Sequence, residues 1–134
     1  MPSSLGSLFR TLTRHSIGPF ARSRVIVAVT VRDEDFRVVR QLSSDRELTA
    51  FRTLWYALVE TDRATWTAPD GRAHFKLDVR HRSPDGRLHA NRWLYHPDGC
   101  VNALAIFRKI WVAPLYRMPD PAAFEALLRD GKEN

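Results

Sequence analysis

The sequence contains the tripeptide Pro-Asp-Gly three times, at residues 69–71, 84–86 and 97–99, each time between segments that are typical of β-strands. Proline presets the first dihedral angle of such a turn, and glycine takes the left-handed position that closes a three-residue hairpin loop with a bulge. The spacing of the turns leaves room for one strand between each pair. The sequence therefore predicts a four-stranded antiparallel meander over residues 62–108.

The turns also predict which residues face each other, because the residues that flank a three-residue loop must pair. The predicted pairs are Ala68 with Arg72, Ser83 with Arg87, and His96 with Cys100. Strand alternation then gives an apolar core face that includes Phe75, Leu77, Val79, Trp93, Tyr95 and Val101. The opposite face is mixed and polar, with Asp62, Trp66, His74, Lys76, Asp78, Arg92, Leu94, His96 and Cys100. We expect this polar face to be solvated or used for binding.

Flanking segments predict the remaining elements. Residues 25–31 and 36–42 read as strands, with a turn between them. Ser44 and Glu47 form a capping-box pattern, and the apolar stripe that follows predicts a helix to about Glu60. Asp120 followed by proline predicts a short C-terminal helix. The expected fold is α+β: an antiparallel sheet of about five to seven strands, one amphipathic helix on its core face and the short helix closing one edge.

Charge is distributed unevenly along the 134 residues. The net charge is +6, but residues 1–32 hold five arginines and no acidic residue, whereas residues 33–134 are nearly neutral. We predict a basic, poorly ordered N-terminal arm over residues 1–23 and a single α+β domain over residues 24–134. The arm is the segment that would bind nucleic acid electrostatically.

No apolar run approaches the roughly 18 residues of a membrane span. The single cysteine, Cys100, excludes a disulfide within the chain. These features predict a cytoplasmic protein. An amphipathic, arginine-rich start without acidic residues also suits a mitochondrial transit peptide, so a mitochondrial location is the alternative.

The predicted register places two imidazoles and a thiol in one row of the polar face, namely His74, His96 and Cys100 beside Trp66. A Cys–His pair can form an activated nucleophile, and two histidines with one cysteine can hold a catalytic zinc ion. The flanking motifs of cysteine hydrolases and the usual zinc-ligand spacings are absent. A surface row with a half-buried cysteine is therefore favoured over a metal site. We expect no cofactor, because no phosphate-binding glycine loop occurs.

The order of elements from Phe36 onward carries a resemblance to a known family. Its landmarks are Leu48-x2-Phe51-x3-Trp55 on a helix, Phe75-x-Leu77-x-Val79, Trp93-Leu94-Tyr95 before a Pro-Asp-Gly turn, Pro114-Leu115-Tyr116-Arg117, and Phe124-x2-Leu127-Leu128. This pattern resembles the small α+β immunity-type proteins of bacterial toxin–immunity systems. The resemblance implies a non-catalytic protein that holds an inhibitory surface against one partner toxin. Immunity proteins against nucleases tend to be acidic, so the basic arm and the neutral remainder imply a target other than a basic nuclease.

We therefore expect a non-catalytic protein-binding domain that uses the polar face of the sheet. Its expected anchors are Trp66, Lys76, Arg92 and Leu94, because aromatic side chains and arginine carry much of the energy of protein interfaces. One alternative is a small enzyme or metal-binding protein that uses His74, His96 and Cys100. The other is a nucleic-acid-binding module that uses the basic arm.

Overall fold

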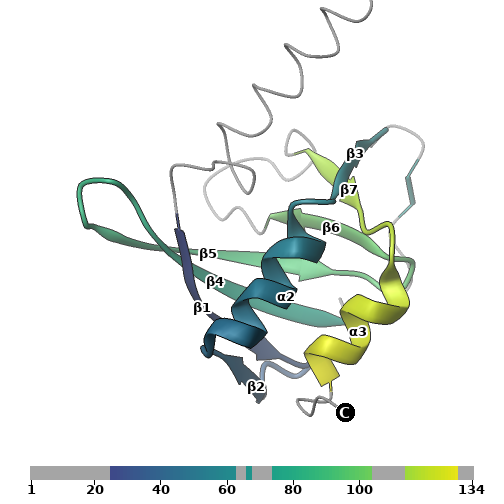
Figure 1. Cartoon of the computed structure of the whole chain (residues 1–134). Helices are drawn as coiled ribbons and strands as arrows, with labels where there is room; N and C mark the ends of the chain where they lie inside the picture. The colour runs from purple at the N-terminus through teal and green to yellow at the C-terminus, as the bar shows by residue number, and fades with distance from the viewer. Residues whose placement is uncertain (1–24, 63–65, 68–73, 104–113, 130–134) are drawn as a thin grey trace, which may run out of the picture.

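The computed structural model describes residues 25–62, 66–67, 74–103 and 114–129. These residues form one antiparallel sheet of seven strands and two helices, which confirms the α+β class (Figure 1). The strands are β1 Val25–Arg32, β2 Val38–Leu42, β3 Val59–Thr61, β4 Phe75–Arg82, β5 Leu88–Tyr95, β6 Cys100–Ala103 and β7 Leu115–Arg117, and the helices are α2 Asp45–Trp55 and α3 Pro121–Arg129. The strand order is β2-β1-β4-β5-β6-β7-β3. The predicted arm over residues 1–23 lies outside the described residues.

Both Pro-Asp-Gly turns in the described residues have the predicted geometry. The amide of Ser83 donates to the carbonyl of Arg87 at 2.9 Å, and the amide of His96 donates to the carbonyl of Cys100 at 2.8 Å. The turn glycines, Gly86 and Gly99, both have φ of 87°. These turns set the predicted register, so that β4 and β5 place Phe75 opposite Tyr95, Leu77 opposite Trp93 and Asp78 opposite Arg92. The third predicted turn, at residues 69–71, lies outside the described residues.

The prediction that the first strand of the meander lies beside β4 is wrong. The strand near Asp62 is β3, which ends at Thr61 and pairs with β7 at the far edge of the sheet. The neighbour of β4 on that side is β1, whose β-branched run offers a long antiparallel ladder from Val25 to Arg32. Arg32, rather than the predicted Asp62, is therefore the residue of the neighbouring strand that reaches Asp78.

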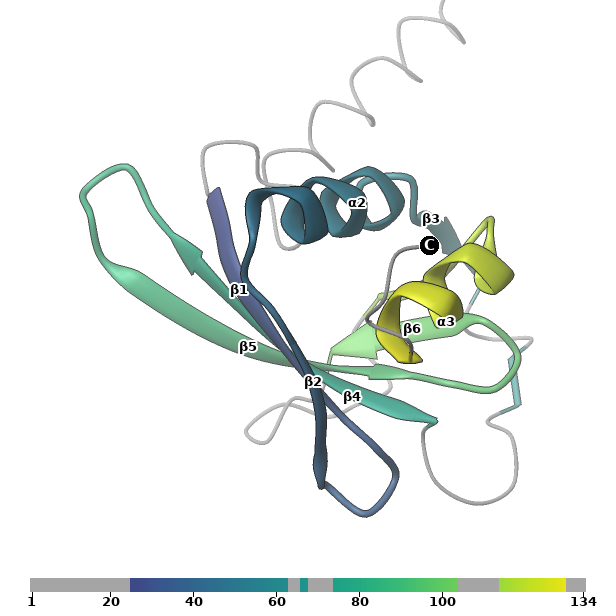
Figure 2. The ribbon, with the colours of Figure 1, turned by 60° about the horizontal axis from the view of Figure 1, so that its bottom comes forward.

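Aromatic rings join the helices to one face of the sheet, where the core lies. Trp55 of α2 meets Trp93 of β5 edge-on, with ring centroids 5.4 Å apart. Phe124 of α3 meets Tyr95 of β5 at 5.1 Å and Phe51 of α2 at 5.8 Å. Figure 2 shows both helices on the same side of the sheet. The opposite face of β1, β4 and β5 carries no helix of the described residues.

One helix boundary and the placement of one helix differ from the predictions. The helix that begins after Ser44 ends at Trp55 and not near Glu60. The next amides, of Ala57 and Leu58, donate to carbonyls only three residues earlier, those of Leu54 and Trp55, each at 3.2 Å. The next residues, Val59–Thr61, then enter β3. The C-terminal helix begins as predicted, with the Asp120 carboxylate accepting the amide of Ala123 at 3.2 Å. Its Phe124 reaches the central strand β5, whereas closure of a sheet edge was predicted.

Candidate binding surface

The turn between β1 and β2 repeats the geometry of the two glycine turns without a glycine. The amide of Asp33 donates to the carbonyl of Arg37 at 2.9 Å, and the amide of Phe36 donates to the carbonyl of Asp33 at 3.0 Å. Phe36 has φ of 66° and is the only non-glycine residue with a positive φ among the described residues. It therefore stands where the other two turns use Gly86 and Gly99. The prediction that a strand begins at Phe36 is wrong, because β2 begins at Val38.

The side chain of Asp33 holds this turn together. Its carboxylate accepts the amide of Asp35 at 2.8 Å and the amide of Arg37 at 3.0 Å. The hydrogen bond from Arg37 is the main reason that the pKa of Asp33 lies below its ordinary value. A carboxylate that accepts two turn amides stabilises the turn in which Phe36 has its left-handed conformation.

The ring of Phe36 lies over two cationic side chains of the sheet. The Nζ atom of Lys76 is 4.3 Å from the ring centroid, and the guanidinium carbon of Arg92 is 5.3 Å from it. Lys76 is buried, and its ammonium donates to the carbonyl of Glu34 at 2.9 Å. Phe36 itself remains 47% exposed. The ring is thus held in place by cation–π contacts while a large part of it faces solvent.

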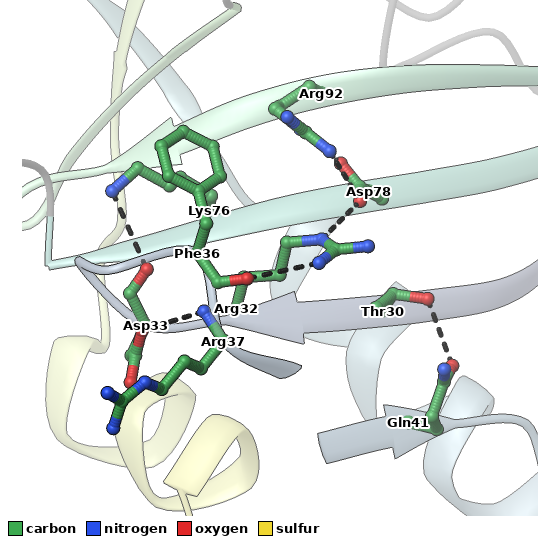
Figure 3. A network of polar contacts seen from close by, with 9 residues as sticks. All are labelled: Thr30, Arg32, Asp33, Phe36, Arg37, Gln41, Lys76, Asp78 and Arg92. Atoms are coloured by element: carbon green, nitrogen blue, oxygen red, sulfur yellow. Dashed lines mark hydrogen bonds and ion pairs between the residues drawn. The ribbon is translucent and has the colours of Figure 1, made fainter. Parts of the chain in front are cut away.

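A carboxylate clamped by two arginines lies beside this ring (Figure 3). Asp78 accepts the Nε of Arg92 at 2.6 Å and its second guanidinium nitrogen at 3.0 Å, and it accepts the Nε of Arg32 at 3.0 Å. Arg32 also donates to the carbonyl of Phe36 at 3.1 Å. Burial opposes ionisation of Asp78, but the hydrogen bonds from both arginines outweigh it and lower the pKa of its carboxyl.

Two further rungs of β4 and β5 continue toward the hairpin tip. Arg80 lies opposite Ala90, and Arg82 lies opposite Leu88. All four residues are exposed. We use the name "open face" for the side of the sheet away from the helices, with Thr30, Arg32, Phe36, Asp78, Arg80, Arg82, Leu88, Ala90 and Arg92.

The structure brings three of the four predicted binding residues together. Lys76 pairs with Leu94, and Arg92 follows on the next rung. Lys76 is 5% exposed, so its nitrogen serves the turn above it and is not offered to a partner. Trp66 belongs to a different cluster: its indole NH donates to Asp98 at 2.8 Å and its ring lies 5.0 Å from that of His96.

Of the predicted row of Trp66, His74, His96 and Cys100, the structure brings Trp66, His96 and Cys100 together, whereas the side chain of His74 has other partners. His74 contacts Arg129 of α3 and the ring of Phe75, whereas His96 is buried and bonded to Asn102 at 2.7 Å. The thiol of Cys100 is fully buried, and burial raises its pKa, with the Asp98 carboxylate adding to the effect. A raised pKa disfavours the thiolate that a nucleophile or a metal ligand needs.

The described residues also hold no group of three or more histidine, cysteine, aspartate or glutamate side chains that could bind a metal ion. Partial desolvation opposes ionisation of Asp98, but its pKa is lowered because the Trp66 indole and the amide of Cys100 donate to its carboxylate. Trp66, His96, Asp98 and Cys100 therefore form a packed polar cluster that ties the turn at residues 97–99 to Trp66.

Sequence reasoning missed Phe36 as a site residue and placed it in a strand. One signal was present: Asp35 precedes Phe36 as Asp85 precedes Gly86 and Asp98 precedes Gly99. The alignment of the three turns on this aspartate would have put Phe36 at the glycine position.

Comparison of the chain with protein-family models, with curated proteins and with solved structures found no match. Of the helices in the described part of the chain, none has the length and apolar character to cross a membrane. The function is therefore inferred from the geometry of the open face.

Proposed function

We propose that this chain is a non-catalytic protein-binding domain that acts through the open face of its sheet, with Phe36 as the central anchor. One observation carries the proposal. Two turns of the same geometry are closed by Gly86 and Gly99, but the turn between β1 and β2 has the exposed Phe36 at the equivalent position. The left-handed conformation costs a bulky residue about 1–2 kcal/mol. A side chain kept at that cost serves a purpose other than the turn.

The surroundings of Phe36 suit an interface. Aromatic side chains and arginine are the residue types that dominate binding energy at protein interfaces. Here the ring is fixed over Lys76, and Arg92 is fixed by Asp78, so little side-chain entropy is lost when a partner binds. The half-buried Leu94 extends the apolar part of this region.

A partner-toxin inhibitor of the immunity type is the form of this function that the order of elements favours. Such a protein needs a rigid surface and no catalytic group. The open face supplies rigid anchors, and the buried Cys100 thiol is not a prepared nucleophile.

Affinity capture with matched variants tests the proposal. The full chain, Phe36→Ala and Val59→Ala are immobilised separately and exposed to lysate from the source organism. Val59 is 50% exposed on β3, at the far edge of the sheet, and so controls for loss of an exposed apolar side chain. We expect one discrete protein to be retained by the full chain and by Val59→Ala but lost with Phe36→Ala. Equal retention by all three forms would contradict the proposal.

A further inference from the structure

The hairpin formed by β4 and β5 extends beyond the body of the protein. Figures 1 and 2 both show its turn projecting past α2, while β1 runs beside β4 as far as Arg82. On the open face, the last two rungs before this turn hold Arg80, Arg82, Leu88 and Ala90, and all four are exposed. These rungs therefore present side chains to solvent on the face away from the helices.

The charges along the open face follow a simple rule. On the inner rung, Arg92 lies opposite Asp78, and their ion pair is made within the chain. On the next two rungs, each arginine of β4 lies opposite an apolar residue of β5: Arg80 faces Ala90 and Arg82 faces Leu88. Among the described residues the side chain of Arg80 has no ion-pair or hydrogen-bond partner, and the side chain of Arg82 donates to the carbonyl of Gly86 at 3.1 Å. The outer rungs therefore lack the carboxylates that the inner rung contains.

We propose that the partner of the open face presents an acidic, extended segment that lies along this hairpin, with carboxylates that pair with Arg80 and Arg82. The inference rests on the proposed protein-binding function and names the chemistry of the partner. Residues two apart on a strand lie about 7 Å apart on the same face, so acidic residues at alternate positions of an extended segment match the two arginines. Arginine binds carboxylates in a bidentate geometry, as Arg92 already does with Asp78.

The same surface fits a protein segment better than a nucleic-acid backbone. The carboxylates at the two ends of the row, Asp78 and Asp85, are already paired with arginines of the chain itself. Leu88, which is 49% exposed, and Ala90 lie opposite the two arginines and offer apolar contacts. A peptide segment has apolar side chains that can use these contacts, whereas a phosphate backbone has none.

The test measures binding of labelled probes by fluorescence anisotropy to the full chain, to the double variant Arg80→Gln with Arg82→Gln, and to the control Arg46→Gln. Arg46 is exposed on α2, on the other side of the sheet, so the control loses an exposed charge away from the open face. The probes are a peptide in which glutamate alternates with threonine, the same peptide with glutamine for glutamate, a DNA duplex and a single-stranded DNA.

We expect the glutamate peptide to bind the full chain and the glutamine peptide to bind far more weakly. The double variant should lose about tenfold in affinity for the glutamate peptide, the effect of two exposed ion pairs, while Arg46→Gln changes little. Equal affinity of the full chain and the double variant, equal losses in the control, or no binding of the glutamate peptide would overturn the inference. If either DNA binds the full chain more tightly than the glutamate peptide does, and the double variant loses that binding, Arg80 and Arg82 bind nucleic acid and the inference is overturned. None of these anisotropy results changes the expected loss of lysate capture with Phe36→Ala. The acidic-segment inference can therefore fail while the proposed binding function stands.

Discussion

At the scale of single residues, Phe36 combines a costly backbone with a stabilised ring. The left-handed conformation costs about 1–2 kcal/mol for a residue of this kind. A cation–π contact at an exposed site returns about 0.5–1 kcal/mol. The contacts with Lys76 and Arg92 therefore offset the backbone cost, and our proposal of a role in binding rests on the part of the ring that stays exposed.

The backbone term can be isolated by two variants that both lack the ring. Phe36→Gly and Phe36→Ala lose the same contacts, but only glycine adopts φ near 66° without strain. We expect Phe36→Gly to have a free energy of unfolding about 1 kcal/mol higher than Phe36→Ala, measured by urea denaturation. Equal stabilities, or a more stable alanine variant, would mean that the turn imposes no strain.

Asp78 links the open face to the pH dependence of stability. The pKa of its carboxyl is lower in the folded state than in the unfolded chain, where it is about 3.9. The contribution of Asp78 to the free energy of unfolding is therefore fully present above the unfolded pKa, and it is lost as the pH falls through the folded pKa. We expect Asp78→Asn to lower the free energy of unfolding by about 2 kcal/mol at pH 7, because Arg32 and Arg92 lose an ionised partner.

The difference between the wild-type protein and Asp78→Asn should shrink as the pH is lowered below about 4. Urea denaturation at a series of pH values measures it. Asp85→Asn at the exposed hairpin tip is the control and should have a smaller effect at neutral pH. A difference that stays constant down to the lowest pH would show that the Asp78 carboxylate is not preferentially ionised in the folded state.

Cys100 gives a chemical readout of burial. Its thiol is fully buried and its pKa is raised, so alkylation by iodoacetamide at pH 8 should be slower than that of a free cysteine by about tenfold or more in the native protein. The rate should rise to that of free cysteine in urea. A native rate equal to or faster than that of free cysteine would restore the nucleophile hypothesis.

At the scale of elements, helix α2 begins with a complete capping box. The Ser44 hydroxyl accepts the amide of Glu47, and the Glu47 carboxylate accepts the amide of Ser44, each at 3.1 Å. Hydrogen bonds from Ser44 and Ser43 are the main reasons that the pKa of Glu47 is lowered. These bonds satisfy amide groups that would otherwise lack partners at the start of the helix.

The cap predicts a difference between two adjacent serines. Ser44→Ala should lower the free energy of unfolding by about 1 kcal/mol, because the hydroxyl is the cap. Ser43→Ala should change it much less, because Ser43 takes part through its backbone amide. Thermal or urea unfolding of both variants measures the difference, and equal losses would argue against the cap.

The elements that could be predicted from the sequence are those with a local chemical marker. Gly86 and Gly99 mark two turns and so the register of β4, β5 and β6, and Ser44 with Glu47 marks the start of α2. The pairing of β3 with β7 has no such marker, because two strands of three residues meet across a long stretch of sequence. Phe36 was missed for a related reason: the turn conformation is held by Asp33 and not by a glycine.

At the scale of the whole molecule, the sheet is asymmetric. One face carries both helices (Figure 2) and the aromatic core. The other presents Phe36, Arg32 and Arg92 (Figure 3), together with the arginines of β4. The division between the two faces could be predicted from strand alternation, since Phe75 and Trp93 lie on the core face as expected. The identity of Arg32 as the partner of Asp78 could not, because it depends on a long-range strand pairing.

Site-specific photocrosslinking tests the central claim most directly. A photoreactive phenylalanine analogue is placed at position 36 of the full chain in the source organism, and in a separate protein at position 59 on β3. We predict one discrete crosslinked protein from position 36 and none of that species from position 59. The same crosslinked protein from both positions, or none from position 36, would contradict the assignment of the open face as the binding surface.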